Sequence, residues 1–207
     1  MVLKCLGSGS SGNCYILQAD KGEKLILECG LPFREIKRGL SYDLRGVVGC
    51  LVSHRHSDHS KALHDVIKAG IRVLAIEDVF VALGVKYRTL CTTIQSMRGY
   101  IIGGFRVLVL EVAHDVPCVG FIIEHAEMGK LLFVTDTMML EWQLPTLDHI
   151  MLECNYSDAT LQHNIDSGLV PAVMRERLMR SHMELQTAKG VLTENDITQV
   201  KEIVLIH

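Results

Sequence analysis

The chain has 207 residues, a length typical of one domain, and 48% of them are hydrophobic, which is enough for a large buried core. The formal net charge is −3, so the composition does not indicate a protein that binds nucleic acid through overall basic charge. No segment approaches the roughly 20 apolar residues that a membrane-spanning helix needs.

Short apolar runs rich in β-branched residues recur along the chain and predict strands. They lie at residues 1–7, 14–19, 23–30, 45–53, 71–76, 106–113, 119–125, 130–136, 149–154 and 202–207. Segments of helical character between them predict helices at 33–41, 60–70, 77–85, 169–183 and 193–202. This order predicts an α/β protein with mixed sheets, and the number of strands favours two sheets over one. We expect a single domain over residues 1–207.

The seven cysteines are scattered along the chain, and none forms a C-x-x-C pair. An odd number of cysteines in apolar segments favours buried free thiols in a reducing compartment over a disulfide framework. The N-terminal segment also lacks the apolar stretch and the cleavage site of a secretory signal peptide. We therefore expect a cytoplasmic protein.

The strand predicted at 45–53 is followed within six residues by His54, His56, Asp58 and His59. Neutral imidazole nitrogens and carboxylate oxygens both bind divalent cations. Side chains alternate between the two faces of a strand, so His54 and His56 share a site only if the strand ends and the chain curls. Asp58 and His59 then lie in the next turn, at the start of a helix. A solvated polar loop is the alternative, but this spacing favours a metal site.

Four other predicted strands also end in groups that can bind or support a metal. These groups are, in chain order, His114 with Asp115, Asp136, Glu153 with Asn155, and His207. One such ending is common, but five strands with this ending indicate a shared sheet edge at which a rigid site is assembled. The remaining histidines have no partners at ligand spacing and are predicted not to bind metal: His64, His125, His149 and His163.

The segment "HRHSDH" and the later ordered residues resemble the metallo-β-lactamase fold superfamily, with its H-x-H-x-D-H signature. Within it, the sequence is most similar to the YycJ/WalJ family of metal-dependent hydrolases. The segments that carry this likeness are "GSGSSGNCYIL", "LECGL", "SHRHSDHSKAL", "VAHDVPCVGFIIE", "FVTDT", "LECNYS", "RSHMEL" and "VLIH". The resemblance implies an αββα sandwich, in which two mixed sheets are flanked by helices.

The resemblance also implies a site for two divalent metal ions, which would be zinc, manganese or iron. The implied ligands are His54, His56 and His114 for the first ion, Asp58, His59 and His207 for the second, and Asp136 as the bridge between them. Asp58 would also orient the nucleophile. His182 would lie beside the substrate phosphate without binding metal, and an ordinary residue at a helix end is the alternative.

Three features depart from the family pattern. Glu28 stands in "LECG" where aspartate is usual, so its role in supporting the ligand loop is left open. "SHMEL" replaces a more usual His-Leu-Ser at His182. Relatives continue beyond the position of His207, and because a terminal ligand frays, we expect the first ion to bind more tightly than the second.

Two other segments have two interpretations each. The loop 7–13, "GSGSSGN", either binds an anion with its backbone N–H groups or forms a tight turn between two strands. Arg175, Arg177 and Arg180 either contact a phosphate backbone or lie on a solvated helix face.

The leading functional prediction is a metal-dependent phosphodiesterase that uses a dinuclear site to activate water, and the YycJ/WalJ resemblance implies nuclease activity on DNA. A small cyclic nucleotide is a rival substrate. A non-catalytic metal-binding or regulatory domain is the alternative from another class.

Overall fold

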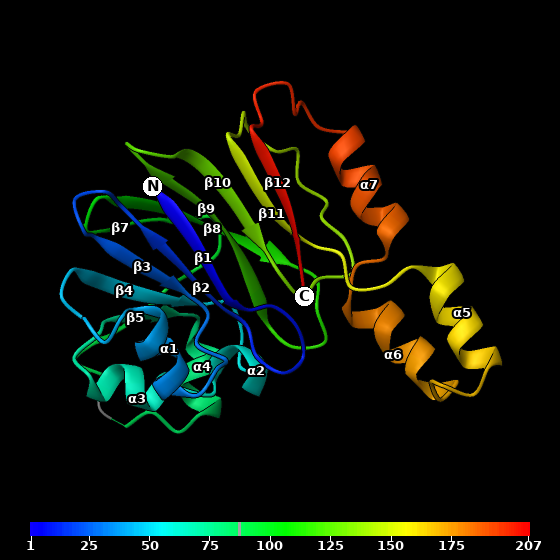
Figure 1. The fold of residues 1–207 in the computed structure, drawn as a ribbon, viewed down its shortest axis with the longest axis horizontal. Helices are drawn as coiled ribbons and strands as arrows, with labels where there is room; N and C mark the ends of the chain where they lie inside the picture. The colour runs from blue at the N-terminus through cyan, green and yellow to red at the C-terminus, as the bar shows by residue number, and fades with distance from the viewer. Residues whose placement is uncertain (87) are drawn as a thin grey trace.

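Two six-stranded sheets face each other in the computed structural model, which describes residues 1–86 and 88–207 (Figure 1). The first sheet holds, in spatial order, β1 (Val2–Gly7), β2 (Cys14–Gln18), β3 (Lys24–Leu27), β4 (Val47–Val52), β5 (Val73–Ala75) and β6 (Cys91–Thr93). The second holds β12 (Glu202–Ile206), β11 (His149–Glu153), β10 (Gly129–Val134), β9 (Cys118–His125), β8 (Phe105–Val112) and β7 (Gly99–Ile102).

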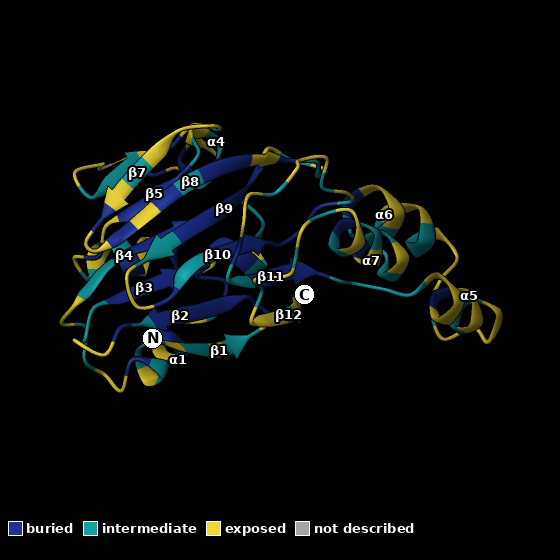
Figure 2. Ribbon diagram, turned by 90° about the horizontal axis from the view of Figure 1, so that it is seen from above, coloured by how far each residue is buried: buried dark blue, intermediate teal, exposed yellow. Residues whose placement is uncertain are grey.

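The main core lies between the two sheets and contains large side chains from both. Tyr15 on β2 meets Phe133 on β10 edge to face, with ring centroids 5.6 Å apart, and Phe121 on β9 stacks against Phe133 at 6.4 Å. The edge strands β1, β7 and β12 keep exposed residues, whereas the central strands β2, β3, β9, β10 and β11 are largely buried (Figure 2). Burial on both faces explains why these strands read as continuous apolar runs in the sequence.

Helices cover the outer faces of both sheets. The first sheet carries α1 (Phe33–Gly39), α2 (Ser57–Ser60), α3 (Leu63–Lys68) and α4 (Glu77–Ala82), and buried residues of α1, α3 and α4 pack in one cluster with those of β3, β4 and β5. On the second sheet, Ala188 and Val191 of α7 (Leu185–Thr193) pack in a cluster with residues of β10 and β11. The predicted αββα sandwich is confirmed.

Two further helices, α5 (Asp158–Asp166) and α6 (Val173–Ser181), follow β11 and extend beyond the sandwich, with most of their surface exposed (Figure 2). In the described part of the chain, none of the helices is long and apolar enough to cross a membrane. All seven cysteines are free thiols, as predicted, but only Cys14, Cys29, Cys50 and Cys118 are buried, and Cys5 is exposed.

The directions of the strands bring their carboxyl ends together. Strands β10, β11 and β12 are parallel, and β8 is antiparallel to β9, which is antiparallel to β10. Four strands of the second sheet therefore end at the same edge. This common edge is the structural basis of the site described below.

The ten predicted strands are present, but the helix predicted at 193–202 is wrong. The helix in this region lies earlier, as α7, and ends at Thr193. The Asp196 carboxylate accepts hydrogen bonds from both the backbone N–H and the hydroxyl of Thr198, and the Asn195 amide donates to a carbonyl in the last turn of α7. Such local bonds compete with helix formation.

Helix α5 was not predicted from the sequence. Only Leu161 of its residues is buried, so the segment has no apolar periodicity that would reveal a helix. The short strands β6 and β7 were also not predicted.

Candidate metal centre

The structure brings all seven predicted metal ligands to one edge of the sandwich. His54 lies two residues after the end of β4, His56 immediately precedes α2, and Asp58 and His59 lie on α2. His114, Asp136 and His207 follow the ends of β8, β10 and β12. The ligand loop thus faces three strand ends of the second sheet, and the site spans both sheets.

The first group of ligands consists of His54, His56, His114 and Asp136, whose ligand atoms all lie within 4.8 Å of one another. His54 Nε2 and His114 Nε2 lie 3.7 and 3.8 Å from Asp136 Oδ2. The Nδ1–H of His114 donates to the backbone carbonyl of Ser181 at 2.7 Å. This bond fixes the tautomer of His114 and leaves the Nε2 lone pair available to a cation.

The second group consists of Asp58, His59, Asp136 and His207, again with ligand atoms within 4.8 Å of one another. Asp136 Oδ1 lies 3.2 Å from His59 Nε2 and 3.5 Å from His207 Nδ1, while His207 Nε2 lies 3.5 Å from Asp58 Oδ2. The two oxygens of Asp136 therefore face different groups, Oδ2 the first and Oδ1 the second. This is the arrangement that a bridging carboxylate needs.

The donor atoms of these groups fit divalent cations. His54 is fully buried, and its Nε2 atom has no hydrogen-bond partner within the described residues. A buried polar atom without a partner is costly, and a cation that accepts its lone pair would remove that cost. Histidine nitrogens combined with carboxylate oxygens suit zinc, manganese and iron.

The charges of the two groups differ. Burial lowers the pKa of His54 well below its usual value, so this imidazole is neutral. For His59, burial also lowers the pKa, but the nearby carboxylates of Asp136, Asp58 and Glu28 outweigh it and raise the pKa well above its usual value. Burial also lowers the pKa of His207, but interactions with Asp58 and Glu153 outweigh it and raise the pKa to about 9.

The two carboxylates of the second group stay ionised. Burial alone would raise the pKa of Asp58 and of Asp136, but the neighbouring histidines His59 and His207 outweigh it and lower both values. The second group therefore consists of two carboxylates and two histidines with raised pKa values, whose opposite charges attract one another.

Glu28 supports the ligand loop from behind. Its side chain is fully buried, its oxygens accept the backbone N–H of Ser53 at 3.1 and 3.4 Å, and one oxygen lies 3.6 Å from His59 Nδ1. Its backbone has a positive φ of 62°, a conformation uncommon for a residue other than glycine. The glutamate thus approaches His59 as a supporting acid would, but without a hydrogen bond to the ring.

The loop 7–13 packs against the ligand helix and forms a tight turn. Gly12 N–H donates to Gly9 O at 2.9 Å, and Gly9 N–H donates to Asn13 Oδ1 at 2.8 Å, so two amides of the loop are used within it. Asn13 N–H donates to Asp58 O at 2.7 Å, and Asn13 Nδ2 lies 3.0 Å from His59 Nε2. These contacts support the turn interpretation over an anion site.

His207 is held at the end of β12, beside the loop between β1 and β2 (Figure 1). Its N–H donates to Ser8 Oγ at 2.8 Å, its ring lies 3.0 Å from Asn155 Nδ2, and its side chain is only 4% exposed. These contacts oppose fraying of the terminal residue, and the fraying itself stays a prediction. The tighter binding of the first ion stays a prediction.

His182 and Glu153 form a pair beside the two groups. His182 Nδ1 donates to Glu153 Oε1 at 2.6 Å, and the buried Glu153 carboxylate also accepts the backbone N–H of Thr137 at 2.6 Å. His182 follows the last residue of α6, so it stands at the C-terminal end of a helix. Both residues also lie within ligand distance of Asp136 and His207. From the sequence, Glu153 was predicted only as one of the polar groups at a strand end that can bind or support a metal.

A cavity of about 270 Å³ opens over the metal ligands. It is lined by Ser10, His56, Ser57, Asp58, His114, Asp115, Asp136, Arg177, Ser181, His182 and His207. Asp115 Oδ1 lies 3.0 Å from His114 Nε2 and 3.6 Å from His56 Nε2, on the side of these rings that faces the cavity, so its role in supporting His114 stays a prediction.

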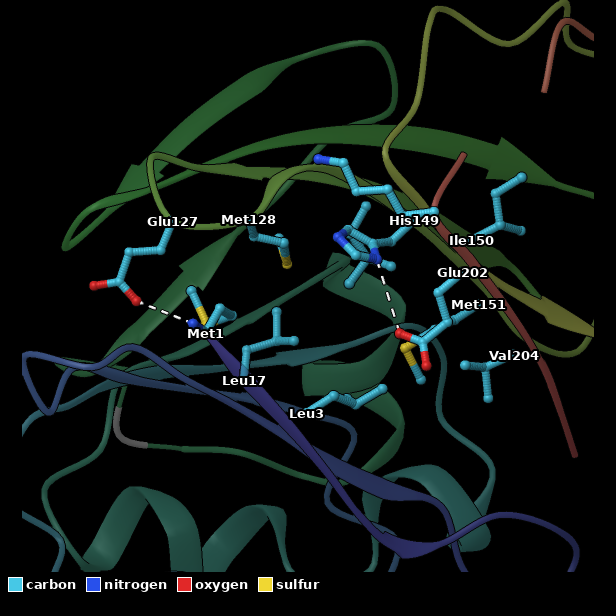
Figure 3. A pocket seen from close by; sticks show the side chains of 12 residues that line it. Met1, Leu3, Leu17, Glu127, Met128, His149, Ile150, Met151, Glu202 and Val204 are labelled. Carbon is cyan, nitrogen blue, oxygen red and sulfur yellow. Dashed lines mark ion pairs between the residues drawn. The ribbon is translucent and has the colours of Figure 1, made fainter. Parts of the chain in front are cut away.

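Another hollow of about 290 Å³ lies at the opposite ends of the strands, where β1, β11 and β12 begin (Figure 3). Its lining is largely apolar, with ion pairs of Met1 to Glu127 at 3.3 Å and His149 to Glu202 at 3.8 Å at its margin. The predicted ligands all lie elsewhere, so chemistry is expected at the metal centre.

The histidines predicted not to bind metal lie outside both groups. His64 Nε2 bonds the carbonyl of Leu83, His125 and His149 face glutamates on the sheet margin, and His163 is on the exposed α5.

The sequence model of the metallo-beta-lactamase superfamily matches residues 7–141, which is more than half of the chain. The chain therefore belongs to the metallo-β-lactamase superfamily. Exodeoxyribonuclease YycJ from Bacillus anthracis is 29% identical over 144 residues, which cover 64% of this chain and 53% of YycJ. This chain thus spans about half the length of that relative.

Solved structures share the fold. YhfI from Bacillus subtilis, a metallo-β-lactamase fold protein, superposes with a TM-score of 0.73 at 17% identity, over 99% of this chain and 85% of YhfI. A diphosphatase of the PhnP family superposes with a TM-score of 0.69 at 15% identity, over 99% of this chain and 93% of the diphosphatase. The resemblance predicted from the sequence motifs is confirmed.

Proposed function

We propose that this protein is a metal-dependent phosphodiesterase that acts on a polynucleotide, with DNA as the first candidate. The observation that carries the proposal is the Asp136 carboxylate, which offers one oxygen to each of two groups of histidine and aspartate ligands. Two ligand groups that share one carboxylate are typical of sites for hydrolytic chemistry at phosphate esters.

In this proposal His54, His56 and His114 hold the first ion, Asp58, His59 and His207 hold the second, and Asp136 bridges them. When bound, zinc, manganese or iron ions would supply a nucleophile from water at neutral pH and neutralise the charge of the phosphate oxygens. Asp58 orients the attacking water, since its carboxylate lines the cavity. His182, held by Glu153 through Nδ1, presents its other ring nitrogen to the leaving oxygen and protonates it.

The relatives support the reaction class. YycJ is named an exodeoxyribonuclease, and one structural neighbour is named a diphosphatase. Both names describe cleavage of bonds to phosphorus. The chain spans about half of YycJ, so the activity of the whole relative is not carried over as a finding. The DNA substrate and the cytoplasmic location are therefore parts of the proposal.

A cyclic nucleotide is the second candidate substrate, because a cavity of about 270 Å³ is small for a site and has room for little more than one small ligand. It would use the same ligands and the same acid. The two candidates differ in whether a second phosphate contributes to binding.

The test is metal content by elemental analysis together with hydrolysis of bis(p-nitrophenyl) phosphate by the metal-loaded protein. The proposal expects up to two equivalents of bound metal and turnover that a chelator abolishes. The matched controls are Asp136→Ala, which should lose both, and His149→Ala, which replaces a histidine at the far end of the sheet and should lose neither. Full metal binding without turnover of any phosphodiester would instead support a non-catalytic metal-binding domain.

A further inference from the structure

Helix α6 carries three arginines, and two of them have partners on neighbouring helical residues. Arg175 donates to Asp158 Oδ1 at 2.6 Å and to Gln162 Oε1 at 2.5 Å on α5. Arg180 donates to Glu176 Oε1 at 2.5 Å within α6. Arg175 thus joins α6 to α5, and both side chains are compensated in charge.

Arg177 is different. Throughout the part of the chain that the structure describes, its guanidinium forms neither a hydrogen bond nor an ion pair, and it lines the cavity over the metal ligands. Among the described residues that line the cavity, Arg177 is the one arginine, and there is no lysine. The acidic residues of the lining are Asp58, Asp115 and Asp136, and the remaining ionisable residues are histidines. A guanidinium that is left free at such a place is suited to an external anion, and phosphate is the anion that its planar fork matches.

The position of Arg177 is fixed relative to the metal centre, because the last turn of α6 is fastened there. Ser181 Oγ donates to the carbonyl of Arg177 at 2.7 Å, and the carbonyl of Ser181 accepts Nδ1–H of the ligand His114 at 2.7 Å. His182 is in turn bonded to Glu153. Arg177 and Ser181 are four residues apart and share a helix face, so the buried Ser181 directs this face toward the site.

Arg177 lies farther out than the groups that would act on the reacting phosphate. His114, Asp136 and His207 have side chains that are 4% exposed or less, and that of His182 is 13% exposed, whereas Arg177 is exposed at the cavity mouth. It precedes His182 by five residues, which is roughly 7.5 Å along a helix. The anion that it meets is therefore displaced outward from the scissile bond.

We propose that Arg177 binds the phosphate next to the scissile one, so that the substrate class is a polynucleotide strand and a lone phosphodiester is a poorer substrate. This rests on the proposed phosphodiesterase function and selects the strand over the cyclic nucleotide. Arg177 binds and orients the strand and takes no part in bond cleavage.

The test uses thymidine trinucleotide TpTpT and its two analogues in which one linkage is a neutral methylphosphonate. The only cleavable bond in an analogue then has an uncharged neighbour. For the metal-loaded parent protein, one of the analogues should show kcat/KM about tenfold below TpTpT, as for one lost charged hydrogen bond. Arg177→Ala should lower kcat/KM on TpTpT by a similar factor and show no further loss on that analogue.

Arg180→Ala is the matched control, since it removes the same charge from the same helix but at a compensated position. It should retain the parent preference for the charged neighbour. Bis(p-nitrophenyl) phosphate, which has a single phosphate, should be hydrolysed equally by the parent and by Arg177→Ala. Equal losses of Arg177→Ala on all substrates, or equal behaviour of the two arginine variants, would overturn the assignment.

A binding measurement separates this assignment from the proposed function. Fluorescence anisotropy with a labelled oligothymidylate at several salt concentrations should give a slope of log K against log salt that is shallower by about 0.7 in Arg177→Ala and unchanged in Arg180→Ala. If the parent hydrolyses no phosphodiester but this difference persists, the phosphodiesterase fails and the strand-binding role of Arg177 stands. If the parent is active and the two slopes are equal, the phosphodiesterase function stands and the strand-binding role of Arg177 fails.

Discussion

Replacing His182 by alanine tests the proposed general acid. The His182 ring is 13% exposed, its Nδ1 is taken by Glu153 Oε1 at 2.6 Å, and the ring lines the cavity. One nitrogen thus anchors the ring, and the other is left to transfer a proton. Loss of a general acid lowers turnover by roughly 10²–10⁴-fold, which corresponds to about 2.7–5.4 kcal/mol of transition-state stabilisation.

The loss should depend on the leaving group. With DNA or a cyclic nucleotide, whose leaving alkoxide must be protonated, His182→Ala should show the full decrease in kcat. With bis(p-nitrophenyl) phosphate the decrease should be much smaller, because p-nitrophenolate leaves without a proton. Metal content, measured by elemental analysis, should equal that of the parent, since the ring is proposed to act on the substrate.

Glu153→Gln probes the same pair from the other side. The fully buried carboxylate accepts from both His182 and Thr137, so the amide should still fill the space while it weakens the hold on the ring. If the two residues act as a unit, His182→Ala combined with Glu153→Gln should be no slower than His182→Ala alone. Parent-like rates of His182→Ala on unactivated phosphodiesters, or loss of metal in this variant, would refute the assignment.

Three further outcomes are expected. Asp136→Ala should lose both metal equivalents and activity together, and a variant that retains either one contradicts the bridging role. The second ion must displace protons from His59 and His207, whose pKa values are raised. Calorimetric titration should therefore show that the affinity for this ion rises with pH toward about 9. An affinity that does not change with pH would count against this ligand group. A Cβ at Gly30 would lie 1.6 Å from the Asp58 carbonyl, so Gly30→Ala should lower stability by about 1–3 kcal/mol and weaken the second site, whereas Gly190→Ala in the open helix α7 should raise Tm slightly.

Much of the metal centre could be predicted because its ligands follow strands. His54, His56, Asp58 and His59 stand close together in the chain, so their spacing alone indicated a site. His114, Asp136 and His207 were found by a weaker signal, the polar ending of an apolar run, and by the family resemblance. The structure places all seven together because the strands that precede them end at one edge.

The supporting contacts could not be predicted in the same way. Glu153 was predicted as a polar group at a strand end, but its bond to His182 joins residues 29 positions apart. Asn13 reaches His59 across 46 positions, from a loop whose composition suggested either a turn or an anion site. Neither contact follows from spacing, because each depends on how a loop or helix folds back onto the sheet.

The amino-acid sequence by itself determined all strands but β6 and β7, the two-sheet class and the metal-binding residue types, because hydrophobic periodicity and ligand chemistry are local properties of the chain. Tertiary structure decided which of three similar arginines on α6 is free: Arg175 and Arg180 find acidic or amide partners, and Arg177 is left facing the cavity. It also decided that Asp136 turns one oxygen to each ligand group. The pair of Arg180 with Glu176 is local, because the two residues lie four positions apart on one helix. The contacts of Arg175 with α5 and the orientation of Asp136 depend instead on packing between segments that are farther apart in the chain, which residue spacing does not reveal.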